Sequence, residues 1–155
     1  MKTVENLQLS EILNTRMNES FPLIQVILGP RQVGKTSFIQ SFTEKDKSKY
    51  YVVDADTISE PSWIANQWQI ARQSKKSIVI DEIQKVPQWS DTIKKLWDES
   101  IKEKKKQKCI LLGSSSLALN RGLSESLTGR FELIRAFHWN FFESNKKMDN
   151  AIWNI

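Results

Sequence analysis

The stretch GPRQVGKT, residues 29–36, follows directly on the apolar run LIQVIL. It satisfies the pattern G-x-x-x-x-G-K-[ST], whose fixed positions are filled by Gly29, Gly34, Lys35 and Thr36. Glycines let the backbone turn tightly and bring successive N–H groups close to phosphate oxygens at the start of a helix. The apolar strand before the pattern and the helical stretch after it are the setting that the pattern requires. The sequence therefore predicts a phosphate-binding loop.

The residues of this loop have separate expected tasks. The Lys35 ammonium would neutralise the β- and γ-phosphates of a nucleotide, and the Thr36 hydroxyl would ligate Mg²⁺. The backbone of the loop would surround the phosphates. The expected contact residues are Gly29, Pro30, Arg31, Gln32, Val33, Gly34, Lys35, Thr36 and Ser37.

A pair of acids follows a second buried strand in the segment SIVIDEIQKVPQW. Asp81 comes directly after the apolar run IVI, where P-loop NTPases place the carboxylate that orients Mg²⁺. Glu82 is next in sequence, and it could accept a proton from the water that attacks the γ-phosphate. Two solvated acids at a strand end are the alternative for an isolated Asp-Glu pair. The upstream loop favours the catalytic interpretation.

Short β-rich runs alternate with helical stretches, which predicts an α/β fold with a mainly parallel sheet covered by helices on both faces. We expect a short leading helix over residues 5–18. Strands are expected at residues 23–28, 50–53, 77–80, 109–112 and 131–136. Between the strands, helices are expected over residues 34–42, from residue 61, from residue 89 and over residues 117–127. After Pro87 an apolar or aromatic residue recurs every four positions, the spacing of one buried helix face.

The serines of residues 113–116 follow the fourth expected strand. If that strand lies between the strands that carry the loop and Asp81, its tip would hold Ser114 or Ser115 near the γ-phosphate. A hydroxyl there could report whether this phosphate is present. The alternative is a loop that only caps the next helix.

Length and composition indicate one soluble domain. A chain of 155 residues with 39% hydrophobic and 26% charged residues can bury a substantial core, so we treat residues 1–155 as one domain. No apolar run approaches the ~20 residues that span a bilayer, and the chain has one cysteine, so we expect a cytoplasmic setting without membrane contact. Cys109 begins the apolar run CILL and is interpreted as a core residue.

The formal charge of +5 would attract anions, ATP included. The densest basic cluster is KEKKKQK, residues 102–108, at the end of an expected helix. Cations there complement the helix dipole, so a solvated helix end is favoured over a patch for nucleic acid or a protein partner. Cys109 and His138 are too few for a structural zinc site.

Three segments together resemble the AAA+ ATPases: GPRQVGKTS, IDEIQKVPQW and LLGSSSLALNRGLSESLTGRFELI followed by HWNF. More narrowly, they look like a prokaryotic family of predicted ATP-binding proteins, whose N-terminal ATPase domain precedes a C-terminal domain of unknown function. The resemblance covers roughly residues 20–142. It implies a P-loop NTPase fold, an AAA+-like three-layer αβα sandwich with five strands in the order 5-1-4-3-2. Residues 140–155 would then begin a truncated C-terminal region.

The resemblance also implies roles for single residues. Lys35 and Thr36 would contact phosphate and Mg²⁺, Asp81 would be the magnesium-binding acid, Glu82 the catalytic carboxylate and Ser114 the sensor-like polar residue. His138 and Trp139 match the pattern of the family, without an assigned task.

The segment LTGRF contains the best match for an arginine that reaches a γ-phosphate. Arg130 would stabilise the charge of the transition state on its own nucleotide or on that of a neighbouring copy. Arg31, Arg121 and Arg135 are alternatives, and each of the four could instead make a structural ion pair.

The sequence therefore predicts a Mg²⁺-dependent ATPase domain, slow in isolation, that drives or times a conformational change of a partner. ATP is expected over GTP from the family likeness. A nucleotide-gated binding module with little turnover is a second hypothesis. A phosphotransferase is less favoured, because the pair Asp81 and Glu82 suits the activation of water. The expected partners are an unknown protein, the missing C-terminal domain or a second copy of the chain, with nucleic acid weakly indicated.

Overall fold

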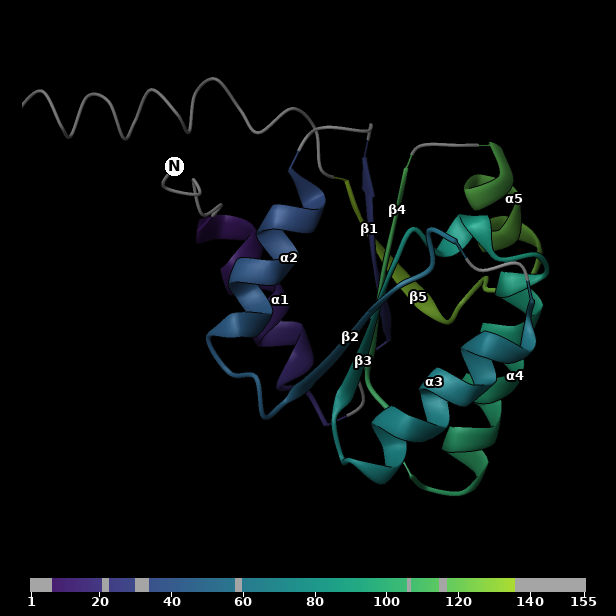
Figure 1. Cartoon of the computed structure of the whole chain (residues 1–155), viewed down its shortest axis with the longest axis horizontal. Helices are drawn as coiled ribbons and strands as arrows, with labels where there is room; N and C mark the ends of the chain where they lie inside the picture. Colours follow the sequence, from purple (N-terminus) through teal and green to yellow (C-terminus); the bar gives the residue numbers. More distant parts are fainter. Residues whose placement is uncertain are drawn as a thin grey trace, which may run out of the picture.

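The computed structural model describes residues 7–20, 23–29, 34–57, 60–105, 107–114 and 117–135. In these residues a central sheet lies between two layers of helices (Figure 1). Helices α1 (Leu7–Met17) and α2 (Lys35–Glu44) cover one face of the sheet. Helices α3 (Ser62–Gln73), α4 (Trp89–Lys102) and α5 (Leu117–Glu125) cover the other. The expected three-layer αβα architecture is confirmed.

The sheet has five strands in the described residues. They are β1 (Ile24–Gly29), β2 (Tyr50–Asp54), β3 (Ser77–Asp81), β4 (Cys109–Ser114) and β5 (Phe131–Arg135). Their order is β2-β3-β4-β1-β5, and all neighbours are parallel. This is the predicted order 5-1-4-3-2 viewed from the opposite edge. Strand β4 lies between β1 and β3, so the condition set for the serine segment is met.

Strand β1 is buried along its whole length, as expected for a strand covered on both faces. Side chains alternate between the two layers because the period of a strand is two residues. Val26 and Leu28 belong to the core beneath α3, α4 and α5. Ile27 belongs to the core beneath α1 and α2. The sheet therefore separates two hydrophobic cores.

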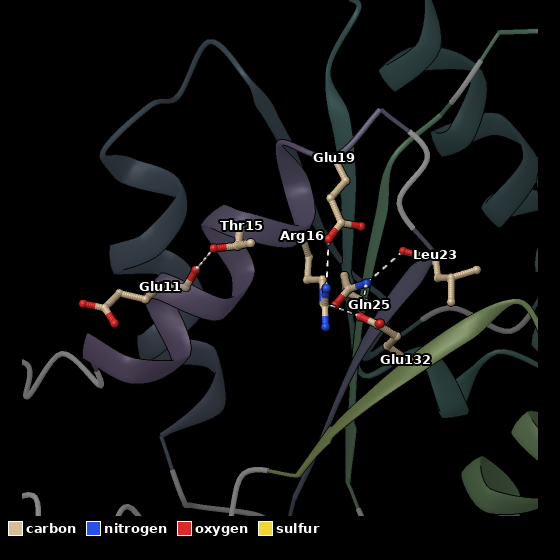
Figure 2. A network of polar contacts seen from close by, with 7 residues as sticks. All are labelled: Glu11, Thr15, Arg16, Glu19, Leu23, Gln25 and Glu132. Atoms are coloured by element: carbon tan, nitrogen blue, oxygen red, sulfur yellow. Dashed lines mark hydrogen bonds and ion pairs between the residues drawn. The ribbon is translucent and has the colours of Figure 1, made fainter.

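Polar contacts join α1 to the sheet (Figure 2). Arg16 Nε lies 2.8 Å from Glu132 Oε2 on β5, and Arg16 Nη1 lies 2.8 Å from Glu19 Oε1. Gln25, with 1% of its surface exposed, donates from Nε2 to the carbonyl oxygen of Leu23 at 3.0 Å and to Glu132 Oε2 at 3.2 Å. These contacts hold the leading helix against β1 and β5.

The four-residue spacing along α4 buries one face, with Trp89, Ile93 and Leu96 in the core and Trp97 partly buried against it. A Cβ on Gly122 would lie 2.6 Å from the Trp89 ring, so this glycine allows α5 to approach α4 closely. Cys109 is buried as expected, and burial raises the pKa of its thiol, which makes it an unreactive core residue.

Candidate nucleotide-binding site

Four strands end at the same edge of the sheet in a glycine or a polar residue. Gly29 ends β1, Asp54 ends β2, Asp81 ends β3 and Ser114 ends β4. In the registers of the sheet, Gly29 is the partner of Ser114, and Asp54 is the partner of Asp81. The carboxyl edge of an open parallel sheet is where α/β proteins bind ligands. Tertiary structure thus gathers the predicted loop, acids and serine at one edge.

Gly34 is the last residue of the predicted phosphate-binding loop before α2 begins. This residue has φ 87°, a left-handed conformation that favours glycine. Lys35 begins the helix with 6% of its surface exposed, and its Nζ donates a hydrogen bond of 2.7 Å to the carbonyl oxygen of Gly29. Burial lowers the pKa of Lys35, while the negative charges of Glu82 and Asp81 oppose that shift. The Lys35 ammonium is therefore buried at the carboxyl end of β1.

A magnesium site would form where Thr36 meets Asp81. Thr36 Oγ1 donates a hydrogen bond of 2.7 Å to Asp81 Oδ2. Two ligand oxygens on adjacent corners of a Mg²⁺ octahedron are about 2.9 Å apart, given Mg–O distances of about 2.05 Å. The hydroxyl and the carboxylate therefore fit the ion. Asp81 is 5% exposed, and burial raises the pKa of its carboxyl, with the hydrogen bond from Thr36 opposing that shift.

Glu82 is held in an uncommon backbone conformation, with φ 55° and ψ 39°. Its N–H donates a hydrogen bond of 2.9 Å to Asp81 Oδ1. The left-handed conformation is unfavourable for a residue other than glycine, and such residues cluster at functional sites. The tight turn lets adjacent acids take different tasks, because Asp81 faces Thr36 while the side chain of Glu82 reaches Gln84.

Gln84, on the short 3₁₀ helix η1 (Ile83–Lys85), joins two of the predicted site residues. Its Nε2 donates to Glu82 Oε2 at 2.6 Å and to Ser114 Oγ at 3.0 Å. Because Ser114 Oγ accepts this bond, its own O–H is available to another acceptor. Gln84 Oε1 is buried without a hydrogen-bond partner among the described residues. A Cβ on Gly113 would lie 2.8 Å from this oxygen, so glycine provides the space for the amide.

A cavity of about 420 Å³ opens at this edge. Its lining residues are Gly34, Lys35, Thr36, Ser37, Asp54, Asp56, Asp81, Glu82 and Lys85. Lys85 pairs with Asp56, whose N–H donates to Asp54 Oδ1 at 2.9 Å. The described residues contain no cluster of three or more His, Cys, Asp or Glu placed to hold a metal alone. A magnesium ion here would take its remaining ligands from phosphate and water.

Sequence reasoning missed four lining or bridging residues: Gln84, Asp54, Asp56 and Lys85. The available signal for Asp54 was its position at the end of an expected strand in a parallel sheet. Gln84 was marked only by being polar in the turn that follows the two acids.

The structure does not bring Arg130 to this cavity. It directly precedes β5, and its carbonyl oxygen accepts from the N–H of Ile24, so it lies at the amino edge of the sheet. With strands rising about 3.3 Å per residue, the length of β5 separates it by roughly 16 Å from the carboxyl edge. Its guanidinium forms two hydrogen bonds with Asp98, Nε to Oδ1 at 2.8 Å and Nη2 to Oδ2 at 3.1 Å. Arg130 therefore does not act on the nucleotide of its own chain, as the sequence had suggested. It forms a structural ion pair with Asp98 instead.

Of the alternative arginines, Arg121 is exposed on α5 and Arg135 ends β5 at the carboxyl edge, but neither lines the cavity. Other predictions fall outside the described residues. These are Pro30, Arg31, Gln32, Val33, Ser115, His138, Trp139 and the expected C-terminal region of residues 140–155.

Comparison with known proteins agrees with this geometry. A family model described as an AAA domain matches residues 22–145. The structure of the Aeropyrum pernix Orc1 protein in complex with DNA has a similar fold, with a TM-score of 0.62 and 12% sequence identity. The match covers 95% of this chain and 48% of that one, so this chain spans about half the length of that protein. No curated protein gives a significant match. In the described residues, no helix is long and apolar enough to cross a membrane.

Proposed function

The chain belongs to the AAA domain family, and on this premise we propose that it binds Mg-ATP at the carboxyl edge and hydrolyses it to ADP and phosphate. One observation carries the proposal: the Thr36 hydroxyl and the Asp81 carboxylate meet at 2.7 Å in a cavity that Lys35 and Glu82 also line. This set combines a cation for phosphate, two oxygen ligands for a metal and a general base.

Binding begins at the loop that precedes α2. The Lys35 ammonium exchanges its bond to the Gly29 carbonyl for an oxygen of the β- or γ-phosphate. The positive end of the α2 dipole favours the same anion. Because the ammonium is already buried beside the loop, little reorganisation is required when the nucleotide arrives.

Thr36 and Asp81 would hold the magnesium ion. When bound, Mg²⁺ supplies positive charge that neutralises the phosphates and the charge that develops during transfer. Asp81 must be deprotonated to act as a ligand. Because a buried carboxylate is unfavourable without a positive partner, a bound Mg²⁺ would stabilise the folded site.

Hydrolysis requires a base and a water molecule. The Glu82 carboxylate accepts a proton from the water, whose oxygen forms a bond to the γ-phosphorus. The bond from the γ-phosphorus to the bridging oxygen breaks, and the electron pair leaves with ADP. Gln84 positions the carboxylate by donating to Oε2, which leaves Oε1 for the water. Ser114 donates its free O–H to the γ-phosphate.

The bridge through Gln84 connects the base to the end of β4. Loss of the γ-phosphate would release the Ser114 hydroxyl, and Gln84 would transmit this change to Glu82. The segment after Ser114 leads into α5, which offers a route from the nucleotide to a partner. The partner proposed here is a protein, a C-terminal effector domain or a second copy of the chain, in a cytoplasmic setting.

Arg130 retains a catalytic role in this proposal only toward a neighbouring copy. It lies at the amino edge and is partly exposed, with 27% of its side chain accessible. An arginine supplied by another subunit can raise the rate of phosphoryl transfer by 10³–10⁵. Such an arrangement requires at least a dimer.

A nucleotide-gated binding module is the second candidate, and one contact favours it. Gln84 Nε2 donates to Glu82 Oε2 at 2.6 Å, and this hydrogen bond occupies one of the two carboxylate oxygens that could accept a proton from water. In that case ATP occupancy sets the state of the protein and turnover is small. Nucleic acid is a further candidate partner, since the similar Orc1 structure is a complex with DNA.

The test is a phosphate-release and binding assay with ATP and GTP, with and without Mg²⁺, on the native chain, Lys35→Ala and Glu82→Gln. The proposal predicts Mg²⁺-dependent ATP turnover in the native chain. Lys35→Ala should lose nucleotide binding, and Glu82→Gln should bind ATP without turnover. ATP binding by the native chain without any phosphate release would select the gated module.

A further inference from the structure

A second, larger cavity lies at the amino edge of the sheet, opposite the nucleotide site. Its volume is about 1030 Å³. Its lining includes Tyr50 and Ser77, which begin β2 and β3, and residues at the ends of α1 and α3. The turns from α2 into β2, from α3 into β3 and from α4 into β4 lie toward the lower end of Figure 1. We call this cavity the basic groove, because most of its charged lining residues are basic.

Basic side chains dominate the lining. They come from the turn after α2, from the end of α3 and from the segment after α4: Lys45 and Lys49, then Arg72, Lys75 and Lys76, then Lys105 and Lys108. Asp46 is the one acid in the lining. Seven cations against one acid give a formal charge of +6, which exceeds the +5 of the whole chain. The excess positive charge of the protein is therefore concentrated in this groove.

The nucleotide cavity has the opposite balance, with four acids and two lysines in its lining. The two edges of the sheet thus carry opposite charge. Since helix C-termini attract cations, some of the lysines in the basic groove complement the dipoles of α2 and α3. That explanation accounts for a cation near each helix end, but not for the gathering of all three groups around one concave surface.

Local structure explains how three of the lysines reach the groove. Helix α3 ends with Lys75 in a left-handed conformation, φ 57°, and the N–H of Lys76 donates to the carbonyl oxygen of Ala71 at 2.9 Å. Helix α4 ends in the same way, with Lys104 at φ 54° and the N–H of Lys105 bonded to Ser100 at 3.0 Å. Glycine is the usual residue at the left-handed position of this helix-ending motif. Both turns instead carry lysine.

Structural partners account for only part of this charge. Lys49 pairs with Asp46 at 3.2 Å, Arg72 pairs with Glu103, and Lys108 donates to the carbonyl oxygen of Met17. Within the described part of the chain, Lys75, Lys76 and Lys105 form no ion pair, although the charge of Lys105, after the contacts from Arg72, helps to lower the pKa of Glu103. Their charges are available to a ligand.

The lining also contains planar amides and two aromatic rings, Phe42 and Tyr50. Gln69 and Gln73 are exposed and lie one turn apart on α3. Gln107 donates to the carbonyl oxygen of Lys76 at 2.6 Å, which leaves its own oxygen as an acceptor. Tyr50 is half-buried, with its ring centroid 5.5 Å from that of Phe42. Amides carry both donors and acceptors, which base edges require, whereas a simple anion would leave the amide acceptors unused.

We propose that the basic groove binds a single strand of nucleic acid. Lys75, Lys76 and Lys105 contact successive phosphates, while the glutamines and Tyr50 face the bases. A positively charged groove with aromatic and amide side chains is the general design of sites for single strands. This site gives the candidate nucleic-acid partner a place on the chain and uses none of the residues that line the nucleotide cavity.

The experiment measures binding of a fluorescently labelled single-stranded oligonucleotide of ~20 nucleotides by anisotropy, between about 50 and 300 mM salt. The test variant is the triple Lys75→Gln, Lys76→Gln and Lys105→Gln. The control is a triple of lysines outside the groove, Lys47→Gln, Lys95→Gln and Lys102→Gln, with the same change of charge. Far-UV circular dichroism establishes that both variants are folded.

The native chain and the control triple should bind with the same steep salt dependence. In the groove triple, the slope of log K against log salt should become shallower by about 2, the expected loss for three single-strand phosphate contacts. Equal losses in both triples would overturn the proposal, because net charge alone would then explain binding. Competition by poly-glutamate or inorganic polyphosphate as effective, per charge, as unlabelled strand would also overturn it.

The measurement is repeated without nucleotide and on Lys35→Ala. The strand should bind this variant as well as the native chain, because Lys35 lies at the opposite edge. Failure of ATP binding with retained strand binding would contradict only the ATPase proposal. The reverse result would contradict only the groove.

Discussion

Thr36 Oγ1 donates a hydrogen bond of 2.7 Å to Asp81 Oδ2 across 45 residues of sequence. The bond joins the first turn of α2 to the last residue of β3. The two residues belong to separate stretches of sequence, a glycine-rich loop and a pair of acids. Because the two stretches meet at one point, we propose that they form a single Mg-nucleotide site.

Magnesium affinity should depend on the protonation of Asp81. Burial raises the pKa of this carboxyl above its ordinary value of 3.8, and a metal must displace the proton. We expect the affinity for Mg²⁺, measured in the presence of ATP, to fall as the pH falls through the raised pKa. Asp81→Asn should bind Mg²⁺ weakly at every pH. An affinity of the native chain that is constant over this range would contradict the assignment of Asp81 as a ligand.

The same shift has a consequence for stability without ligand. The folded state holds the Asp81 proton more tightly than the unfolded state, so it binds more protons between 3.8 and the raised pKa. The contribution of Asp81 to the free energy of unfolding is therefore present below this window and falls as the pH rises through it. Urea titrations of the native chain and Asp81→Asn should differ with this sign. A contribution that grew with pH would contradict it.

Glu82→Gln should remove hydrolysis and keep binding. The amide lacks the basicity to accept a proton from water, so turnover should fall by 10²–10⁴ while the Kd for Mg-ATP stays within a few-fold. Glu99→Gln, an exposed acid on α4, is the matched control and should leave turnover unchanged. Equal turnover in the two variants would exclude Glu82 as the base.

Gln84→Ala shows whether the hydrogen bond from Gln84 positions the Glu82 carboxylate for catalysis or restrains it and slows hydrolysis. If the amide positions the Glu82 carboxylate, its loss should lower kcat by about tenfold and leave KM unchanged, as for a group that acts in the transition state. A rise in kcat would show that the 2.6 Å contact restrains the base, and would favour the gated module. Gly113→Ala should act in the same direction as Gln84→Ala, because its Cβ would lie 2.8 Å from Gln84 Oε1.

Arg130→Ala should affect both stability and assembly-dependent turnover. Loss of the paired hydrogen bonds to Asp98 should cost about 0.5–1 kcal/mol in the free energy of unfolding, because the pair is partly exposed. A mixture of Arg130→Ala and Glu82→Gln chains should recover part of the turnover that each lacks, since the second supplies the arginine and the first supplies the base. Absence of recovery in the mixture would leave Arg130 with its structural ion pair alone.

Local patterns were sufficient for the elements of the fold. The apolar run before Gly29 is typical of a buried strand, and the four-residue spacing after Pro87 is typical of one helix face. Each element could therefore be predicted from its own residues. The order of the strands depended on the family resemblance, because periodicity says nothing about which strands are neighbours. The structure confirmed that order and placed Ser114 beside Gly29.

Features that depend on several distant segments escaped sequence reasoning. Arg130 was matched to a γ-phosphate by its motif, yet its place before β5 sets it at the amino edge, beside Asp98 of α4. The lysines of residues 102–108 were interpreted as a helix end. Lys105 and Lys108 also line a groove with residues from α2 and α3. These residues come together only because the turns that follow α2, α3 and α4 pack side by side in the fold.

The most direct test of the shared magnesium site is a double-mutant cycle of Thr36→Val and Asp81→Asn. For each variant, titration calorimetry measures ATP binding with and without Mg²⁺. We predict that Mg²⁺ increases ATP affinity in the native chain and that either substitution abolishes this increase. The double variant should then be no worse than the single ones, because both residues serve one ion. Full Mg²⁺ enhancement in either single variant, or strictly additive losses, would contradict a joint magnesium site at the carboxyl edge.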